Sequence, residues 1–198
     1  TSVPQMKVLR EPFLKRPLDI VLSLFMLILS IPVFLPIVLA IKLEDGGPVF
    51  YRQERWGRSG KYFRTYKFRT MVVDAEKSGA KITVEGDLRI TPSGRFLRKY
   101  KLDELPQLWN VLSGEMSLVG PRPERPHFVE QFKNEIGRYM WRHVSKPGMT
   151  GWAQVNGYRG DTSIAQRVKY DLYYLENWSL AFDFKILLRT LFARENAY

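Results

Sequence analysis

The chain has 198 residues, which is enough for one domain with a buried core, and it carries a formal net charge of +11. It has no cysteine and two histidines, His127 and His143. Disulfides, thiolate metal sites and a cysteine nucleophile are therefore excluded, and a multi-histidine metal cage is disfavoured. The charge indicates an anionic partner, for which nucleic acid, an acidic membrane surface and a phosphorylated substrate are the candidates. Because the sequence begins with Thr1 rather than Met, we expect a processed or trimmed chain.

Residues 20–41 form a run of 22 uncharged residues, nearly all of them large and apolar. Eighteen or more such residues are typical of a membrane segment. A cleavable signal peptide is a poor match because the run is too long and the charged residues of 42–45 follow directly.

Two features predict that this segment enters and leaves the membrane on one side. Pro32 and Pro36 lie within the run, and each removes a backbone donor, so we expect a helix broken by a bend at Pro32. Basic residues flank both ends, which places both ends in the cytoplasm: Lys7, Arg10, Lys15 and Arg16 before it, and Lys42, Arg52, Arg55, Arg58, Lys61 and Arg64 after it. A straight span with a proline kink is the alternative.

The remaining chain reads as short elements. Gly46 and Gly47 end the first helix, and residues 49–51 and 61–68 predict two strands around a turn at 57–60. We expect a polar irregular stretch over 75–91 and a rigid loop at 121–123. Predicted helices cover 94–100, 106–112, 124–144, 163–175 and 182–192.

The last predicted helix is amphipathic. Phe184, Leu187, Leu188 and Leu191 share one face, with Lys185 and Arg189 among the residues towards its polar side. Such a helix suits the surface of an anionic membrane, and an ordinary core-facing helix is the alternative.

Asp103 and Glu104 are adjacent carboxylates just ahead of Pro106, which suits the first turn of a helix. Acidic residues at a helix start are commonly caps. The sequence around them is strongly basic, with Arg95, Arg98, Lys99 and Lys101 before the pair and Arg122 and Arg125 after it.

A carboxylate can attack phosphorus to form an acyl phosphate. Two like charges at about 4 Å repel by about 4 kcal/mol near a protein surface, so cations must first neutralise the phosphates. Arginines and a divalent metal do this. A glycosidase fits poorly, because its two carboxylates lie about 5 Å or more apart on either side of the sugar.

Other segments are weaker signals. The stretch from Lys67 to Thr70 is either a phosphate-binding strand or a solvated edge, and Arg122 lies on a stiff loop between two prolines. Residues 147–152 offer backbone amides and a tryptophan ring, for a ligand or for a tight turn.

Together these stretches resemble the bacterial sugar transferase family, the monotopic polyprenyl-phosphate phosphoglycosyl transferases. The matching motifs occur in order across residues 15–192: KRPLD at 15–19, GPVFYRQ at 47–53, KFRTM at 67–71, LDELPQLWNVL at 102–112, GEMSLVGPRPE at 114–124, and the stretch 146–157. Ile31 precedes Pro32 where many members have Ser-Pro, and Arg159 is displaced by Tyr158 from its usual place.

The resemblance implies a reaction at the cytoplasmic face of the bacterial inner membrane. Asp103 would attack the β-phosphate of a UDP-sugar, UMP would leave, and polyprenyl phosphate would then accept the sugar phosphate. Glu104 would support the site, Asp103 would hold part of a Mg²⁺ ion, and Arg98 would bind phosphate. Further substrate-binding candidates are Lys67, Arg69, Arg122, Glu124, Arg125 and Arg159. Residues 156–162 look most like glucose-phosphate transferases of exopolysaccharide pathways.

The implied fold is mostly α with a small β-hairpin: a monotopic membrane protein with an N-terminal re-entrant helix-break-helix (1–44) and a cytoplasmic catalytic domain (45–198) ending in amphipathic interfacial helices. Expected partners are the UDP-sugar, polyprenyl phosphate and the phospholipid membrane, with a homodimer left open and no nucleic acid. Two other classes are a membrane-tethered nucleic-acid-binding module and a non-catalytic scaffold. The carboxylates of Asp103 and Glu104 argue against nucleic-acid binding, because they would repel a phosphate backbone. In a non-catalytic scaffold, the same two carboxylates would be only helix caps.

Overall fold

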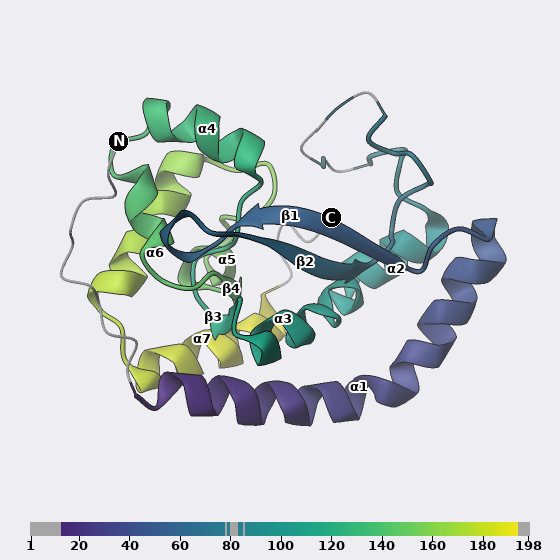
Figure 1. The fold of residues 1–198 in the computed structure, drawn as a ribbon, viewed down its shortest axis with the longest axis horizontal. Helices are drawn as coiled ribbons and strands as arrows, with labels where there is room; N and C mark the ends of the chain where they lie inside the picture. Colours follow the sequence, from purple (N-terminus) through teal and green to yellow (C-terminus); the bar gives the residue numbers. More distant parts are fainter. Residues whose placement is uncertain (1–12, 78, 80–82, 85, 194–198) are drawn as a thin grey trace.

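The computed structural model describes residues 13–77, 79, 83–84 and 86–193, so Lys7 and Arg10 of the basic flank lie outside the described residues. The described part is mostly helical, with two small two-stranded sheets, as the sequence predicted for its helical content and its hairpin. A long N-terminal helix runs along the underside of the molecule (Figure 1).

That helix, α1 (Lys15–Asp45), is uninterrupted and contains both Pro32 and Pro36. Figure 1 shows its ribbon running along the bottom and then turning upwards, a change of direction that the two missing backbone donors explain. It ends where the sequence predicted, because Gly46 adopts the left-handed conformation (φ 70°) that closes a helix.

Both ends of α1 are bound to the rest of the protein. At the start, Lys15 Nζ pairs with Asp183 Oδ2 at 2.6 Å, and Asp19 Oδ1 accepts the Leu118 amide at 3.0 Å. At the end, Asp45 accepts two hydrogen bonds from the Arg69 guanidinium. The helix is therefore anchored to one body at both ends.

The two predicted strands form an antiparallel hairpin, β1 (Phe50–Trp56) and β2 (Tyr62–Phe68), with Phe50 opposite Phe68 and a 3-10 turn, η1 (Arg58–Gly60), between them. Strand β1 extends further than predicted. The outer edge of β2 is completed by a side chain: Asn110 accepts the Tyr66 amide at 3.1 Å and donates to the Arg64 carbonyl at 2.8 Å.

Three short helical elements follow, namely α2 (Pro92–Lys99), η2 (Leu102–Glu104) and α3 (Gln107–Ser113). Thr91 caps α2 by accepting the Gly94 amide at 3.1 Å. A Cβ added to Gly94 would lie 2.1 Å from the Thr70 carbonyl oxygen, so only glycine lets α2 pack this closely on the end of β2.

A second, parallel strand pair was not predicted: β3 (Ser117–Val119) beside β4 (Gly148–Thr150). The two strands approach closely because Gly120 and Gly148 lack side chains; a Cβ on Gly148 would lie 2.1 Å from the Gly120 nitrogen. Three-residue strands carry too little alternation to be recognised from sequence.

The prediction of one continuous helix over 124–144 was wrong. The segment is divided into α4 (Pro126–Glu135) and a 3-10 helix, η3 (Tyr139–His143). The break occurs because Ile136 is extended and Arg138 adopts a left-handed conformation (φ 61°), which interrupts the helical hydrogen bonding.

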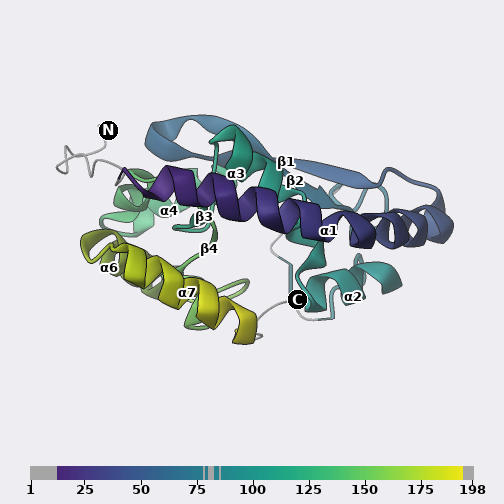
Figure 2. The same cartoon turned by 90° about the horizontal axis from the view of Figure 1, so that it is seen from below.

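The chain closes with α5 (Trp152–Val155), α6 (Ile164–Glu176) and α7 (Leu180–Phe192). Helix α7 packs one face into the core and leaves apolar side chains exposed on another. Ile186 is fully buried in the main core, which also includes Leu108, Val111 and Tyr174, whereas Leu188 and Leu191 are 62% and 71% exposed. Seen from below, α1 and α7 lie side by side on the underside (Figure 2).

Candidate active site

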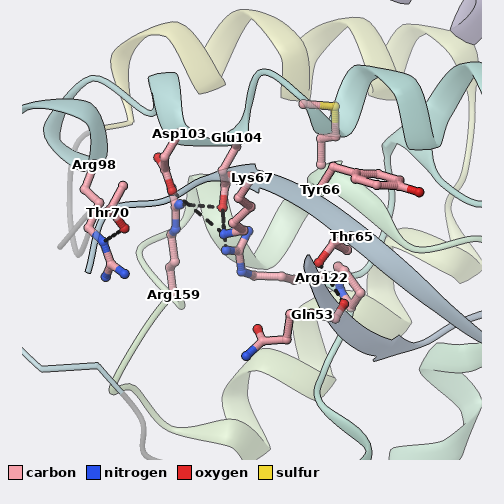
Figure 3. A network of polar contacts seen from close by, with 12 residues as sticks. Gln53, Thr65, Tyr66, Lys67, Thr70, Arg98, Asp103, Glu104, Arg122 and Arg159 are labelled. Carbon is pink, nitrogen blue, oxygen red and sulfur yellow. Dashed lines mark hydrogen bonds and ion pairs between the residues drawn. The ribbon is translucent and has the colours of Figure 1, made fainter. Parts of the chain in front are cut away.

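The structure brings both carboxylates and several predicted cations to one cavity of about 680 Å³. Strand β2 supplies Lys67, η2 supplies Asp103 and Glu104, and the loops after β3 and before α6 supply Arg122 and Arg159. Figure 3 shows these side chains converging on Glu104.

The local backbone turns both carboxylates inward. Lys101 adopts a left-handed conformation (φ 57°) at the start of η2, which directs the chain away from α2 before α3 begins. Asp103 and Glu104 are only 5% and 6% exposed. No side-chain cap hydrogen bond is found at the start of α3, so the two acids are not helix caps in the described structure.

Glu104 is held by three cations. Its Oε1 lies 2.7 Å from Lys67 Nζ, 2.7 Å from Arg122 Nη2 and 3.2 Å from Arg159 Nη2. Burial alone would raise the pKa of this carboxyl, but Arg122, Lys67 and Arg159 hold the pKa well below its usual range. Glu104 therefore favours its ionised form, which holds the cations in place.

Asp103 has a different environment. Its Oδ2 lies 3.9 Å from Lys67 Nζ, which is beyond hydrogen-bonding distance. Burial and the negative charge of Glu104 raise the pKa of Asp103, against the opposing effect of Lys67 and Arg98. A carboxylate that is buried and not hydrogen-bonded to a cation keeps its basicity, which suits a nucleophile.

Arg122 is positioned from behind by a buried ion pair. Arg142 is fully buried, pairs with Asp171 at 2.7 Å and donates to the Arg122 carbonyl at 3.0 Å. Glu124, another predicted site residue, lines the cavity and pairs with Arg167 at 2.6 Å.

The remaining predicted arginines line the same cavity with different partners. Arg98 donates to Thr70 Oγ1 at 2.8 Å (Figure 3), and Arg125 forms a two-pronged ion pair with Glu76 at 2.8 and 3.0 Å. Arg69 is turned towards Asp45 and the Pro48 carbonyl, so it links β2 to the end of α1 and lies apart from the group around Glu104.

The donor set near Asp103 limits the kind of metal it could bind. No group of three or more potential His, Asp or Glu ligands occurs among the residues that the structure describes. Mg²⁺ is usually held by one or two carboxylates, waters and substrate phosphates, not by a cage made only of protein ligands. Because Glu104 is committed to cations, Asp103 is the carboxylate in this group that fits such a role.

The sequence pattern of bacterial sugar transferases matches residues 10–195, nearly the whole chain. The chain belongs to the bacterial sugar transferase family. The resemblance seen in its motifs is thereby confirmed.

Three curated relatives are similar to this chain. One from Aeromonas hydrophila, named UDP-N-acetylgalactosamine-undecaprenyl-phosphate N-acetylgalactosaminephosphotransferase, is 45% identical over 90% of this chain and 43% of its own length. UDP-glucose:undecaprenyl-phosphate glucose-1-phosphate transferases from Escherichia coli and Caulobacter vibrioides are 48% and 44% identical, over 90% and 93% of this chain. These matches cover 39% of the Escherichia coli protein and 72% of the Caulobacter vibrioides protein. The chain therefore spans about two fifths of the length of the Aeromonas hydrophila and Escherichia coli relatives.

The cavity has an excess of positive charge. Nine basic and five acidic side chains line it, which favours a ligand with several negative charges. Sequence reasoning missed three lining residues on β1: Tyr51, Gln53 and Arg55. They occupy alternate positions of a strand, a spacing of two that would have placed them on one face once the strand had been predicted at its full length.

Proposed function

We propose that the protein transfers a sugar-1-phosphate from a UDP-sugar to a polyprenyl phosphate such as undecaprenyl phosphate. The observation that carries this proposal is the pair Asp103 and Glu104, both buried at one cavity, with Glu104 bound by three cations and Asp103 left free of a close ion pair. The names of the relatives, which act on UDP-sugars and undecaprenyl phosphate, support the same substrates.

In the first step, an Asp103 carboxylate oxygen forms a bond to the β-phosphorus of the UDP-sugar. The bond from that phosphorus to the bridging oxygen breaks, and UMP leaves with the electron pair. In the second step, a phosphate oxygen of the polyprenyl phosphate attacks the same phosphorus and displaces Asp103, which gives the polyprenyl diphosphate sugar. Each step exchanges one P–O bond for another, so no oxidant or reductant is needed.

The cations around Glu104 make this attack electrostatically feasible. Lys67, Arg122 and Arg159 are held at the cavity wall by Glu104, so their donors need no rearrangement when charge moves onto the leaving phosphate. Glu104 offsets part of their charge and prevents their mutual repulsion from opening the site.

A Mg²⁺ ion bound by Asp103 and the substrate phosphates would neutralise negative charge on the pyrophosphate. Asp103 fits one ligand position for such an ion, and the remaining ligands would come from the substrate and water.

We also propose that α1 enters the membrane from the cytoplasmic side and returns to it. The helix is long and apolar enough to cross a bilayer, and only 17% of its most apolar stretch is buried. Its two ends are bound to the same body through Asp183 and Arg69, which supports insertion from one side. The reaction would then be the first membrane step of bacterial glycoconjugate synthesis, with exopolysaccharide or lipopolysaccharide as the product class and a hexose such as glucose as the sugar.

The test replaces Asp103 by Asn in the full chain, in detergent micelles with polyprenyl phosphate and Mg²⁺. UMP release is measured for a panel of UDP-sugars, with radiolabelled sugar to detect a covalent adduct after acid quenching. We expect UMP release to fall at least about a thousand-fold and the labelled adduct to disappear, because the attacking group is lost.

Glu135→Gln serves as the control, because it removes one exposed negative charge on α4 outside the cavity. This variant should retain wild-type release. Wild-type rates for Asp103→Asn, or a wild-type enzyme that never carries label, would rule out the aspartyl intermediate.

A further inference from the structure

Strand β1 places a cation in the cavity that the steps above do not use. Tyr51, Gln53 and Arg55 line the cavity, whereas the intervening residues Arg52 and Glu54 do not. Arg55 is half-buried and donates through Nη1 to the Pro123 carbonyl at 3.1 Å and through Nη2 to Gln53 Oε1. Both acceptors are uncharged.

This lack of a carboxylate partner is unusual within the cavity. Most of its other arginines have an ion pair: Arg122 and Arg159 with Glu104, Arg125 with Glu76, Arg167 with Glu124 and Arg69 with Asp45. Among the described arginines of the lining, only Arg55 and Arg98 have no carboxylate within ion-pair distance. The structure therefore leaves two guanidinium groups available to an anion.

Burial makes the isolation of Arg55 costly. Loss of water, together with the like charges of Arg122 and Arg125, lowers the pKa of Arg55 to about 10 even though Glu124 opposes the shift. A partly desolvated cation gains most from a charged acceptor that brings its own hydrogen bonds. A phosphate group has this chemistry, and a bidentate contact matches the guanidinium geometry.

The positions of the two guanidinium groups distinguish the two phosphates of a nucleotide sugar. Arg98 is bound to Thr70 and lies beside Asp103 in Figure 3, whereas Gln53, which accepts a hydrogen bond from Arg55, lies on the side of Arg122. In an in-line displacement the leaving phosphate lies on the far side of the attacked phosphorus from the nucleophile. The α-phosphate would thus lie away from Asp103, towards Arg55.

The same end of the cavity suits the rest of the nucleotide. The segment that follows Pro123 contributes Phe128 and Phe132 to the lining, and aromatic rings are common stacking partners for bases. We propose that Arg55 binds the α-phosphate of the nucleotide, the group that leaves as part of UMP. This assignment rests on the proposed function, because it takes a UDP-sugar as the substrate.

The experiment compares the binding of UMP and of uridine to the full chain in detergent micelles, by titration calorimetry. The variants are Arg55→Gln and Arg55→Lys, with Arg52→Gln as the matched control, because Arg52 is on the same strand but outside the cavity and contacts the Tyr66 ring. We expect Arg55→Gln to bind UMP about ten- to a hundred-fold more weakly and to bind uridine as the wild type does. Arg55→Lys should recover part of the loss.

Three outcomes would overturn the proposal: unchanged UMP binding by Arg55→Gln, an equal loss for UMP and uridine, or no UMP binding by the wild type. The equal loss would identify Arg55 as a structural residue, and thermal melting of each variant reports folding directly. The outcome is separable from the fate of the aspartyl mechanism. A protein that binds UMP through Arg55 but never forms the labelled adduct retains this site and loses only the proposed role of Asp103.

Discussion

Asp103 and Glu104 are neighbours in sequence, but their surroundings push their pKa values apart. Three cations keep Glu104 ionised, whereas burial and the charge of Glu104 raise the pKa of Asp103. Two carboxylates with divergent pKa values usually divide the work of a site. In the proposed reaction, the division is between an anchor for cations and a group that must lose its proton before it can attack.

Lys67 links the two carboxylates and should control the pH dependence of the reaction. Its charge lowers the pKa of Asp103, so Lys67→Gln removes that effect and raises the pKa further. The proposed attack requires ionised Asp103, so the acid limb of kcat/KM for UMP release should move to higher pH in Lys67→Gln. The rate should also fall at every pH, because a phosphate-binding cation is lost; the measurement is a full pH–rate profile.

Lys133→Gln is the control for this profile, because Lys133 pairs with Glu130 on the surface of α4. Its acid limb should coincide with that of the wild type. If the acid limb of the Lys67→Gln profile lies at the same pH as that of the wild type, the limb does not reflect the ionisation of Asp103.

At the scale of elements, α2 depends on one glycine. Gly94 packs against the Thr70 carbonyl, and Arg98, one turn later on α2, reaches Thr70 Oγ1. Gly94→Ala forces the helix away from β2, because the new Cβ would overlap a backbone oxygen. We expect a loss of about 1–3 kcal/mol in the free energy of unfolding, measured by denaturant titration, and weaker substrate use as Arg98 moves.

Gly137→Ala is the matched substitution at an open position, since nothing lies within 4 Å of a Cβ added there. It should leave both stability and activity close to those of the wild type. Equal stability of the Gly94 and Gly137 variants would contradict the packing argument.

The elements that the sequence predicted well are those whose signals are local. Strand β2, α2, α3, α6 and α7 have clear periodicity or clear breakers, and the left-handed Gly46 ended α1 as expected. The strand pair β3 and β4 could not be found in this way, because its strands are short and joined only by long-range contact. The break in the predicted 124–144 helix depends on the conformation of Arg138, a residue type that rarely adopts a positive φ.

The site followed the same pattern. Its residues were predicted because basic residues and the acidic pair lie in recognisable motifs, and the structure brings Lys67, Arg122 and Arg159 together on Glu104. The partner of Arg69 was not predictable, because Asp45 lies at the end of the helix, 24 residues away along the chain. Arg55 was missed because its strand was predicted too short.

At the scale of the whole molecule, α1 and α7 carry many of the exposed large apolar side chains. Val21, Phe25 and Leu29 on α1 are 63%, 59% and 60% exposed, and Leu188 and Leu191 are exposed on α7, the helix that lies beside α1 in Figure 2. Buried Ser23, Ile37 and Ile41 show that α1 also contacts the body along its length. An exposed apolar surface of this extent, on a helix packed on one body, indicates membrane association.

The absence of cysteine allows a direct test of the one-sided insertion of α1. Single cysteines would replace three residues in turn. Phe13 lies just before the helix and is 90% exposed, Leu43 lies in its last turn and is 85% exposed, and Leu29 lies near its middle. Lys133→Cys marks the side on which the catalytic part lies. The measurement is labelling by a membrane-impermeant maleimide in intact spheroplasts and in inverted vesicles.

Because one body holds both helix ends, positions 13, 43 and 133 should all react in inverted vesicles and not in spheroplasts. Position 29 should resist the reagent in both, because lipid covers it, and should react after the membrane is dissolved in detergent. A helix that crosses the bilayer would instead expose 13 and 43 on opposite sides. That result would require the folded body that holds Lys15 and Asp45 to lie on both sides of the hydrocarbon core, which these two ion pairs do not allow.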